Sequence, residues 1–257
     1  MQESTIYPHQ PAADTKIPPH TSKPTTTTKY STLRASFTIT YILLLTTATI
    51  TFIEAIRTKN PTVRHVLNLE TCISVVAGYF YSAFKDKIES SARPTAQGPT
   101  DLDNIPIDWE YITKTRYIDW SITTPMMLLA LCVVLSNEIK SPVHLPVIAT
   151  IIVLNYAMLY AGYLGETQQI ERGTANIAGF VPFLAMFGII YWNYVRPKYD
   201  LANRVLFFIY LIIWSMYGIV YMLDEYTKNT AMNVLDLIAK CIVGLGLWVY
   251  YVHIVVL

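Results

Sequence analysis

A lysine, Lys240, stands inside a long apolar run near the end of the sequence, with Asp236 four residues before it. A charged amine in the middle of a membrane helix costs roughly 2.5–3.5 kcal/mol on insertion scales, so such residues are rare and usually functional. The spacing of four places both side chains on one helical face, where the carboxylate can neutralise the amine. Asp119 is a second carboxylate inside an apolar run. One amine and two acids in apolar surroundings are typical of a chromophore bound through a Schiff base, with its counterions. The plainer alternative is a buried ion pair that joins two helices.

Three polar side chains around Asp119 follow a helical spacing. Arg116, Asp119 and Thr123 lie at positions i, i+3 and i+7, so they form one stripe on one helical face. If this stripe faces the interior, it places an arginine, an acid and a hydroxyl near Lys240. Asp236 then supplies a second acid. Such a cation requires nearby anions, because moving an isolated charge out of water is prohibitive. The alternative for Arg116 alone is an arginine that extends to the membrane surface.

The composition identifies the class of protein. Of the 257 residues, 53% are hydrophobic and 14% are charged, whereas soluble domains carry about 25% charged residues. Because the apolar residues fall in long runs, we expect an integral membrane protein. A net charge of +1 argues against a nucleic-acid partner. The three cysteines lie in apolar runs without CxxC spacing and the five histidines are scattered, so neither a metal site nor a disulfide framework is expected.

The apolar runs predict an all-α membrane protein with a seven-transmembrane-helix bundle. Each run is close to the ~20 residues that cross a bilayer. The expected spans are 35–56, 65–84, 114–136, 143–164, 175–195, 203–223 and 230–255. Residues 34–257 form one predicted domain. Residues 1–33 are rich in Pro, Thr and Lys, and they predict a disordered extracellular tail.

Basic residues in the short loops predict the orientation in the membrane. They flank or fill the first, third and fifth loops, namely Arg57, Lys59, Arg64, Lys140, Arg196, Lys198 and Arg204. Because cytoplasmic loops carry the excess of Lys and Arg, these loops are expected inside. The N-terminus is then outside the cell and the C-terminus is cytoplasmic.

Two motifs carry a family resemblance. The expected third span reads Arg116-Tyr117-Ile118-Asp119-Trp120-Ser121-Ile122-Thr123-Thr124-Pro125, and the seventh contains Leu235-Asp236-Leu237-Ile238-Ala239-Lys240. RYxDWxxTTP followed by LDxxAK resembles the microbial (type 1) rhodopsins, such as bacteriorhodopsin and proteorhodopsin, and especially those of marine protists and giant viruses. The resemblance implies that all-trans retinal is linked to Lys240. It implies further that Asp119 is the primary counterion and proton acceptor, Asp236 the second counterion, Arg116 the gating arginine, and Thr123 the hydroxyl that bonds the acceptor.

The resemblance also implies the residues of a retinal pocket. Met158 and Gly162 would face the ionone ring, Met127 is at the usual colour-tuning position, and Trp214 would press on the polyene. Tyr217 and Tyr79 would serve the carboxylate of Asp236. With Trp120, these complete the expected cofactor-binding set. The alternative for the aromatic members is ordinary core packing.

The sequence departs from the pump pattern at the cytoplasmic proton donor. The family usually has a carboxylate seven residues after the threonine, and here that residue is Ala130. Glu70 is the candidate replacement, because a carboxyl buried in the second span favours the protonated form that a donor needs. Glu70 could instead reach the headgroups, or line a cation path with Glu54. The extracellular release acids are not clearly matched, and Asp224, Glu225 and Glu110 are candidates by location only.

These features predict a light-driven ion transporter, and not an enzyme, with the proton as the transported ion. A light-gated cation channel of the same family is the first alternative, favoured by Ala130, Glu54 and Glu70. Two further alternatives are a sensory photoreceptor and a seven-helix membrane protein that carries no chromophore. The expected partners are the lipid bilayer, the transported ion and further copies of the chain in a homo-oligomer.

Overall fold

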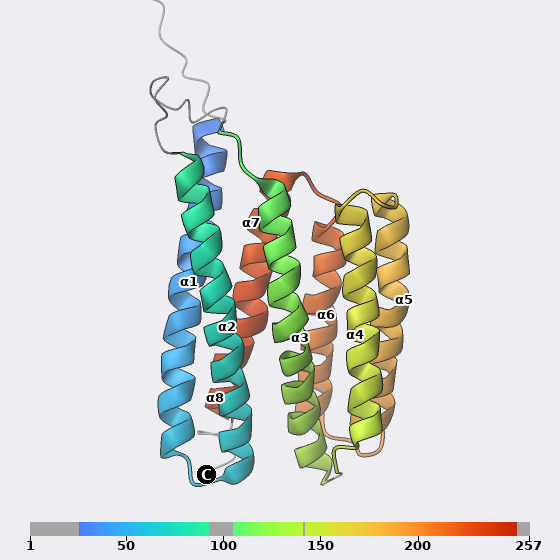
Figure 1. Ribbon diagram of the computed structural model, residues 1–257. Coiled ribbons are helices and arrows are strands. Elements are labelled where there is room, and N and C mark those ends of the chain that lie inside the picture. Colours follow the sequence, from blue (N-terminus) through green and yellow to red (C-terminus); the bar gives the residue numbers. More distant parts are fainter. Residues whose placement is uncertain (1–25, 93–104, 141, 251–257) are drawn as a thin grey trace, which may run out of the picture.

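A computed structural model describes residues 26–92, 105–140 and 142–250, which form seven helical rods packed side by side (Figure 1). The first six rods are formed by the helices α1 Thr26–Arg57, α2 Pro61–Ser91, α3 Trp109–Ile139, α4 Leu145–Glu166, α5 Arg172–Ile190 and α6 Leu201–Val220. A π-helical segment, Tyr191–Val195, extends α5. The seventh rod consists of α7 Glu225–Asp236, a π-helical segment Leu237–Ile242 and α8 Val243–Val249. The predicted all-α, seven-helix bundle is confirmed.

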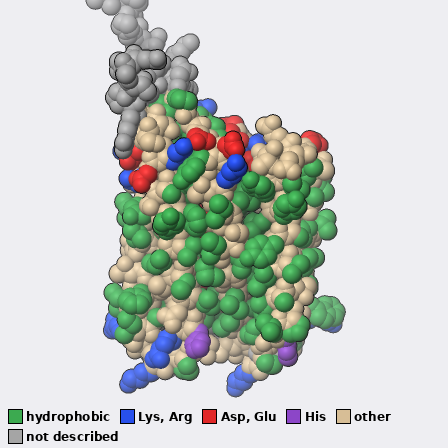
Figure 2. Space-filling model, in the orientation of Figure 1, with side chains coloured by type: hydrophobic (Ala, Val, Ile, Leu, Met, Phe, Trp, Pro, Cys, Tyr) green, Lys and Arg blue, Asp and Glu red, His purple; other side chains and the backbone are tan. Residues whose placement is uncertain are grey.

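The surface of the bundle is that of a multi-pass membrane protein. Within the described residues, six helices are long and apolar enough to cross a membrane. The remaining rod, α2, has 31 residues and is amply long, but it carries several charged side chains, mostly toward its ends. Figure 2 shows apolar side chains over the middle of one face and charged side chains gathered at its two ends. This distribution matches a bilayer core between two aqueous surfaces.

The first helix begins earlier than expected. The sequence predicts a disordered tail over 1–33, whereas α1 starts at Thr26; residues 1–25 lie outside the described residues. The reason is packing against the end of α2. Tyr30 and Leu33 are buried, and the Tyr30 hydroxyl donates a hydrogen bond to the carbonyl of Ile88 at 3.2 Å. Apolar contacts with α2 therefore stabilise helical structure that the local composition does not favour.

Polar side chains inside the bundle come mainly from α3 and the seventh rod. The buried set on these two elements is Arg116, Asp119, Thr123, Thr124, Ser136, Lys228, Asn229, Asn233, Asp236 and Lys240. Lys240 lies within the π-helical segment Leu237–Ile242. Such segments are rare and occur frequently at functional sites. The interface between α3 and the seventh rod is therefore the place to look for chemistry.

Candidate functional site

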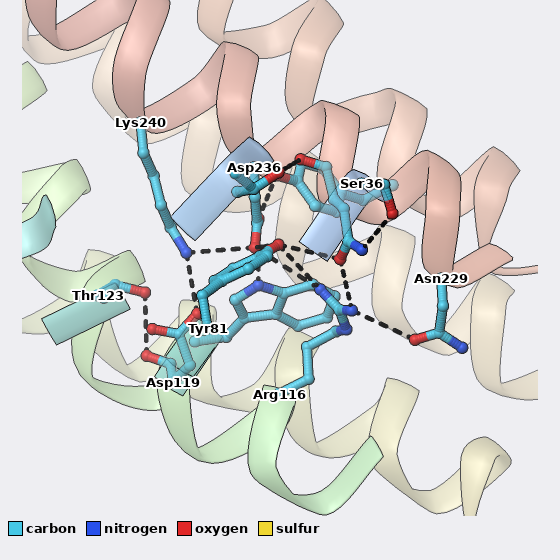
Figure 3. Close-up of polar contacts among 12 residues, drawn as sticks. Ser36, Tyr81, Arg116, Asp119, Thr123, Asn229, Asp236 and Lys240 are labelled. Carbon is cyan, nitrogen blue, oxygen red and sulfur yellow. Dashed lines mark hydrogen bonds and ion pairs between the residues drawn. The ribbon is translucent and has the colours of Figure 1, made fainter. Parts of the chain in front are cut away.

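The amine of Lys240 lies between two carboxylates (Figure 3). Its Nζ atom is 2.9 Å from Oδ2 of Asp119 on α3 and 3.4 Å from Oδ2 of Asp236 on α7. All three side chains are buried. A buried ion is tolerated only when partners replace the water it has lost, so these contacts account for a lysine in an apolar interior. The structure thus brings together the amine and the two acids that the sequence singled out.

The two carboxylates differ in their hydrogen bonds. Asp236 accepts from the hydroxyls of Tyr217 at 2.7 Å and Tyr81 at 2.8 Å, and from the indole of Trp120 at 3.4 Å. These three donors stabilise Asp236 as an anion. The Oδ1 atom of Asp119, in contrast, is buried and has no hydrogen-bond partner in the described part of the chain. Asp119 therefore has the free lone pairs that an arriving proton needs.

Tyr81, rather than Tyr79, serves Asp236 from the second helix. The prediction for Tyr79 is wrong: this side chain is 70% exposed on the outer surface of the bundle, whereas Tyr81 is 0% exposed. Because a helix has 3.6 residues per turn, a step of two residues moves a side chain to nearly the opposite face. The spacing from Glu70 could have identified the correct residue, since Glu70, Ala77 and Tyr81 lie on the buried stripe of α2 at i, i+7 and i+11.

Arg116 is held by neutral groups from the seventh rod and α2. Its guanidinium donates to Oδ1 of Asn233 at 2.8 Å, to Oδ1 of Asn229 at 3.2 Å and to the Tyr81 hydroxyl at 3.3 Å. It also forms an ion pair with Asp236 at 3.7 Å. Arg116 is buried, which contradicts the alternative of an arginine that extends to the membrane surface. The two asparagines were missed, although they precede Asp236 on the same helical stripe.

Thr123 does not contact the carboxylate of Asp119. Its hydroxyl donates to the backbone carbonyl of Asp119 at 2.9 Å, one turn back along α3. Threonines inside helices commonly form this bond, because the hydroxyl lies within reach of the i−4 carbonyl. The hydrogen bond that the family resemblance implies therefore joins the same two residues but goes to the backbone carbonyl, because the carboxylate of Asp119 turns toward Lys240.

A cavity extends from Lys240 and Asp236 to α4 and α5. Six expected pocket residues line it, namely Trp120, Met127, Met158, Gly162, Trp214 and Tyr217. Other lining residues were not predicted, among them Thr124, Phe180 and Phe183. Aromatic and thioether side chains suit an apolar polyene, and the amine of Lys240 at the wall suits a covalent link to an aldehyde. Together with the unpartnered Asp119 oxygen, this lining fits retinal.

The position at which the family usually has its proton-donating carboxylate is apolar in this chain. Ala130 is fully buried. Glu70 of α2 is also buried, which excludes the alternative that it reaches the headgroups. Glu54, the other acid considered for a cation path, forms an ion pair with Arg57 at 2.9 Å at the end of α1.

A second ion cluster closes the end of the bundle near the start of α7. Lys228 is buried and lies 2.7 Å from Glu166 of α4 and 2.8 Å from Glu225. Arg172 of α5 lies 3.0 Å from Glu225. Of the other candidate release acids, Asp224 caps α7 and Glu110 pairs with Lys114. The Lys228–Glu166 pair was missed because Lys228 precedes the expected span, and sequence spacing does not relate α7 to α4.

Comparison with known proteins gives a consistent result. A family model described as bacteriorhodopsin-like protein matches residues 31–254. The crystal structure of viral rhodopsin OLPVRII is 39% identical with a TM-score of 0.75, and the match covers 85% of this chain and 97% of that one. Thermophilic rhodopsin has a TM-score of 0.70 at 20% identity, covering 86% and 92% of the two chains, which shows the fold alone. The green-light absorbing proteorhodopsin of Gamma-proteobacterium EBAC31A08 is 24% identical over 53% of this chain, and the match spans 60% of that relative.

Proposed function

Because the chain belongs to the family of bacteriorhodopsin-like proteins, we propose that it is a light-driven ion transporter whose transported ion is the proton. Retinal is the cofactor of this family. One observation carries the proposal: the amine of Lys240, which lines an apolar cavity, lies 2.9 Å from the buried, incompletely hydrogen-bonded carboxylate of Asp119. A proton can cross that distance directly, without an intervening water.

The roles of the charged side chains follow from their contacts. When it is bound to Lys240 through a protonated Schiff base, retinal supplies the absorption of light and a change of shape. Asp119 accepts the proton of the Lys240 nitrogen. Asp236 remains an anion, because three donors stabilise its charge. Arg116, buried 3.7 Å from Asp236, balances the second negative charge. Two cations and two anions then leave the resting site close to neutral.

Glu70 is the proposed donor that returns a proton to Lys240. It is buried, and among the described residues no basic side chain forms an ion pair with it. A buried carboxyl without a cation favours its neutral, protonated form, which is the form that can donate. Ala130 cannot take this role, and Glu54 is engaged by Arg57. Proton uptake would therefore occur through α2 rather than through α3.

We propose that the end of the bundle opposite the start of α1 faces the cytoplasm. On the face drawn in Figure 2, this end carries Lys, Arg and His side chains, whereas the other end carries both signs of charge. Basic residues at the cytoplasmic ends of helices are the usual pattern. Glu70 then lies on the cytoplasmic side of Lys240 and Arg116 on the outer side, so the proton would leave the cell.

Photocurrents measured against voltage test the proposal. A pump keeps one sign of current at all modest voltages, whereas a light-gated cation channel reverses at the equilibrium potential of its ion. The channel is the second candidate for two reasons. Ala130 stands where a pump usually has its donor carboxylate, and Glu70 places a carboxyl group elsewhere in the interior of the bundle. We expect outward current without reversal, abolished by Asp119→Asn. A current that reverses would overturn the pump and favour the channel.

A further inference from the structure

The carboxyl group of Glu70 lies against the backbone of Gly244 in α8. A Cβ atom added to Gly244 would lie 2.7 Å from Oε2 of Glu70 and 3.4 Å from its carboxyl carbon. A Cβ atom does not approach a carboxylate oxygen so closely, so even alanine would displace the acid. The bare backbone of Gly244 therefore provides the space that the Glu70 carboxyl fills.

This contact relates the acid to Lys240. Gly244 follows Lys240 by four residues on the seventh rod, which is about one helical turn and roughly 6 Å along the axis. Glu70 thus packs against the backbone one turn beyond that of Lys240, whose amine it is proposed to reprotonate. A displaced carboxyl would change the distance over which the proton must travel.

No polar contact fixes the Glu70 carboxyl. No ion pair or hydrogen bond within the described residues holds it, and the titratable side chains near enough to feel its charge are Tyr210 of α6 and Cys241 of the π-helical segment. The hydroxyl of Ser74, one turn along α2, is buried and also unpartnered in the described part. Without a polar partner, the position of the carboxyl depends on packing, and the contact with Gly244 is one that a single methyl group would remove.

A second glycine in the same helix provides a contrast. Glycine in a helix is less stable than alanine, so alanine should be tolerated wherever its methyl group meets no atom. Gly246, two residues further on in the same helix, is exposed, and a Cβ added there would meet no atom within 4 Å. The two glycines share one helix but differ in what a methyl group would contact.

We propose that Gly244 is a positioning residue, which seats the Glu70 carboxyl at the place from which it returns a proton to the Lys240 nitrogen. This inference rests on the proposed donor role of Glu70. Since a misplacement of about 1 Å can cost up to ~10²-fold in rate, the added methyl group should have a measurable effect. The resting colour should not change, because Gly244 is absent from the lining of the cavity.

The test compares Gly244→Ala with Gly246→Ala in the retinal-loaded protein. Flash photolysis follows the return of the proton as the decay of the blue-shifted absorbance. Light-minus-dark infrared spectra follow the carboxyl C=O band that Glu70→Gln removes. We expect Gly244→Ala to slow the decay by about 10-fold and to shift that band, and Gly246→Ala to match the wild type. In a Glu70→Gln background, Gly244→Ala should add no further delay.

The outcomes separate the two proposals. If Glu70→Gln slows the decay but Gly244→Ala changes neither decay nor band, Glu70 is the donor and the role of Gly244 is wrong. If Glu70→Gln itself leaves the decay unchanged, the donor role fails, and the role of Gly244 with it. Should Gly244→Ala not fold, Glu70→Asp withdraws the carboxyl from Gly244 without adding an atom. A wild-type decay and band in Glu70→Asp would likewise overturn the positioning role.

Discussion

The hydroxyl of Tyr81 donates a hydrogen bond of 2.8 Å to Oδ2 of Asp236, so α2 is bonded to the seventh rod beside Lys240. The same hydroxyl accepts a hydrogen bond from Arg116 at 3.3 Å. A single phenol thus joins the buried arginine to the buried carboxylate. Tyr217 bonds the other oxygen of Asp236 from α6, so three helices converge on one carboxylate.

We expect Tyr81→Phe to destabilise the protein, because the buried carboxylate of Asp236 and the buried guanidinium of Arg116 each lose a hydrogen bond. The loss of such a partner costs about 1–3 kcal/mol. The temperature at which the visible band bleaches, measured at a fixed scan rate, should therefore fall. Tyr79→Phe is the matched control: that side chain is 70% exposed and should bleach as the wild type does. Equal bleaching of the two variants would contradict the role of Tyr81.

Lys240→Ala should abolish the visible band that forms on adding all-trans retinal, while the protein remains folded. The amine at the wall of the cavity is the group that can form the covalent link. Lys228→Met is the control, because this second buried lysine pairs with Glu166 in the cluster at the start of α7 and is absent from the cavity lining. Its variant should keep the band. An Lys240→Ala protein with a normal band that resists hydroxylamine would disprove the linkage.

Glu70→Gln should slow the return of the proton at neutral pH, since a positioned general acid contributes about 10²-fold or more. External azide should partly restore the rate by carrying protons from bulk water, and the colour should stay intact. Glu54→Gln serves as the control, because Glu54 pairs with Arg57 instead of lying free in the interior. If recovery is normal in Glu70→Gln but cation permeability drops, the channel gains support over the pump.

The sequence predicted the bundle and the centre of the site because both depend on strong local signals. Apolar runs of membrane-spanning length define the rods, and charged residues inside such runs are rare enough to be informative. Lys240 and Asp236 share one helical face, and Arg116 and Asp119 share another. The remaining step, that these two faces meet, was supplied by the family resemblance.

The errors and omissions concern relations between helices. Choosing Tyr81 over Tyr79 required the rotation of α2 about its axis, which the buried stripe through Glu70 indicates but the two tyrosines by themselves do not. The Lys228–Glu166 pair joins α7 to α4, and the Glu70–Gly244 contact joins α2 to α8. Neither contact leaves a periodic pattern in the sequence. Helix packing determines such pairs, and it becomes visible only in three dimensions.

Asp108, at the start of α3, should make stability depend on pH. Its carboxylate accepts from the backbone N–H of Tyr111 at 3.0 Å and pairs with Lys87 at 2.7 Å. Lys87 first, and then the Tyr111 N–H, hold the pKa of Asp108 below its usual value. Because the folded-state pKa is lowered, the stabilisation is present above the ordinary Asp pKa of about 3.9 and is lost as the pH falls through the lower folded value.

Asp108→Ala should therefore cost about 1 kcal/mol at neutral pH, the usual effect of removing an N-cap. Most of that cost reflects the cap, because the pair with Lys87 is partly exposed and screened by solvent. Asp108→Asn keeps a capping oxygen but lacks the charge, so at neutral pH it should be slightly less stable than the wild type. In acid, where Asp108 is itself protonated, this difference in stability should vanish, whereas the loss of stability in Asp108→Ala should remain. The bleaching temperatures of the two variants and the wild type, measured at neutral pH and in acid, test this prediction. If the difference between Asp108→Asn and the wild type grows in acid, the charge of Asp108 does not stabilise the folded protein in the predicted direction.

Asp119→Asn should move the absorption band to longer wavelength and abolish outward current. In the retinal-bound resting state, the positive charge would lie near the Lys240 nitrogen, where the carboxylate of Asp119, 2.9 Å from the free amine, would stabilise it. Removing the negative charge raises the energy of the resting state more than that of the excited state, in which the charge is spread along the polyene. The energy gap therefore narrows. Acid should reproduce the shift in the wild type by protonating Asp119, and further acid should not move the band of Asp119→Asn. If neither the substitution nor acid moves the band, Asp119 is not the counterion, and Asp236 must hold that role.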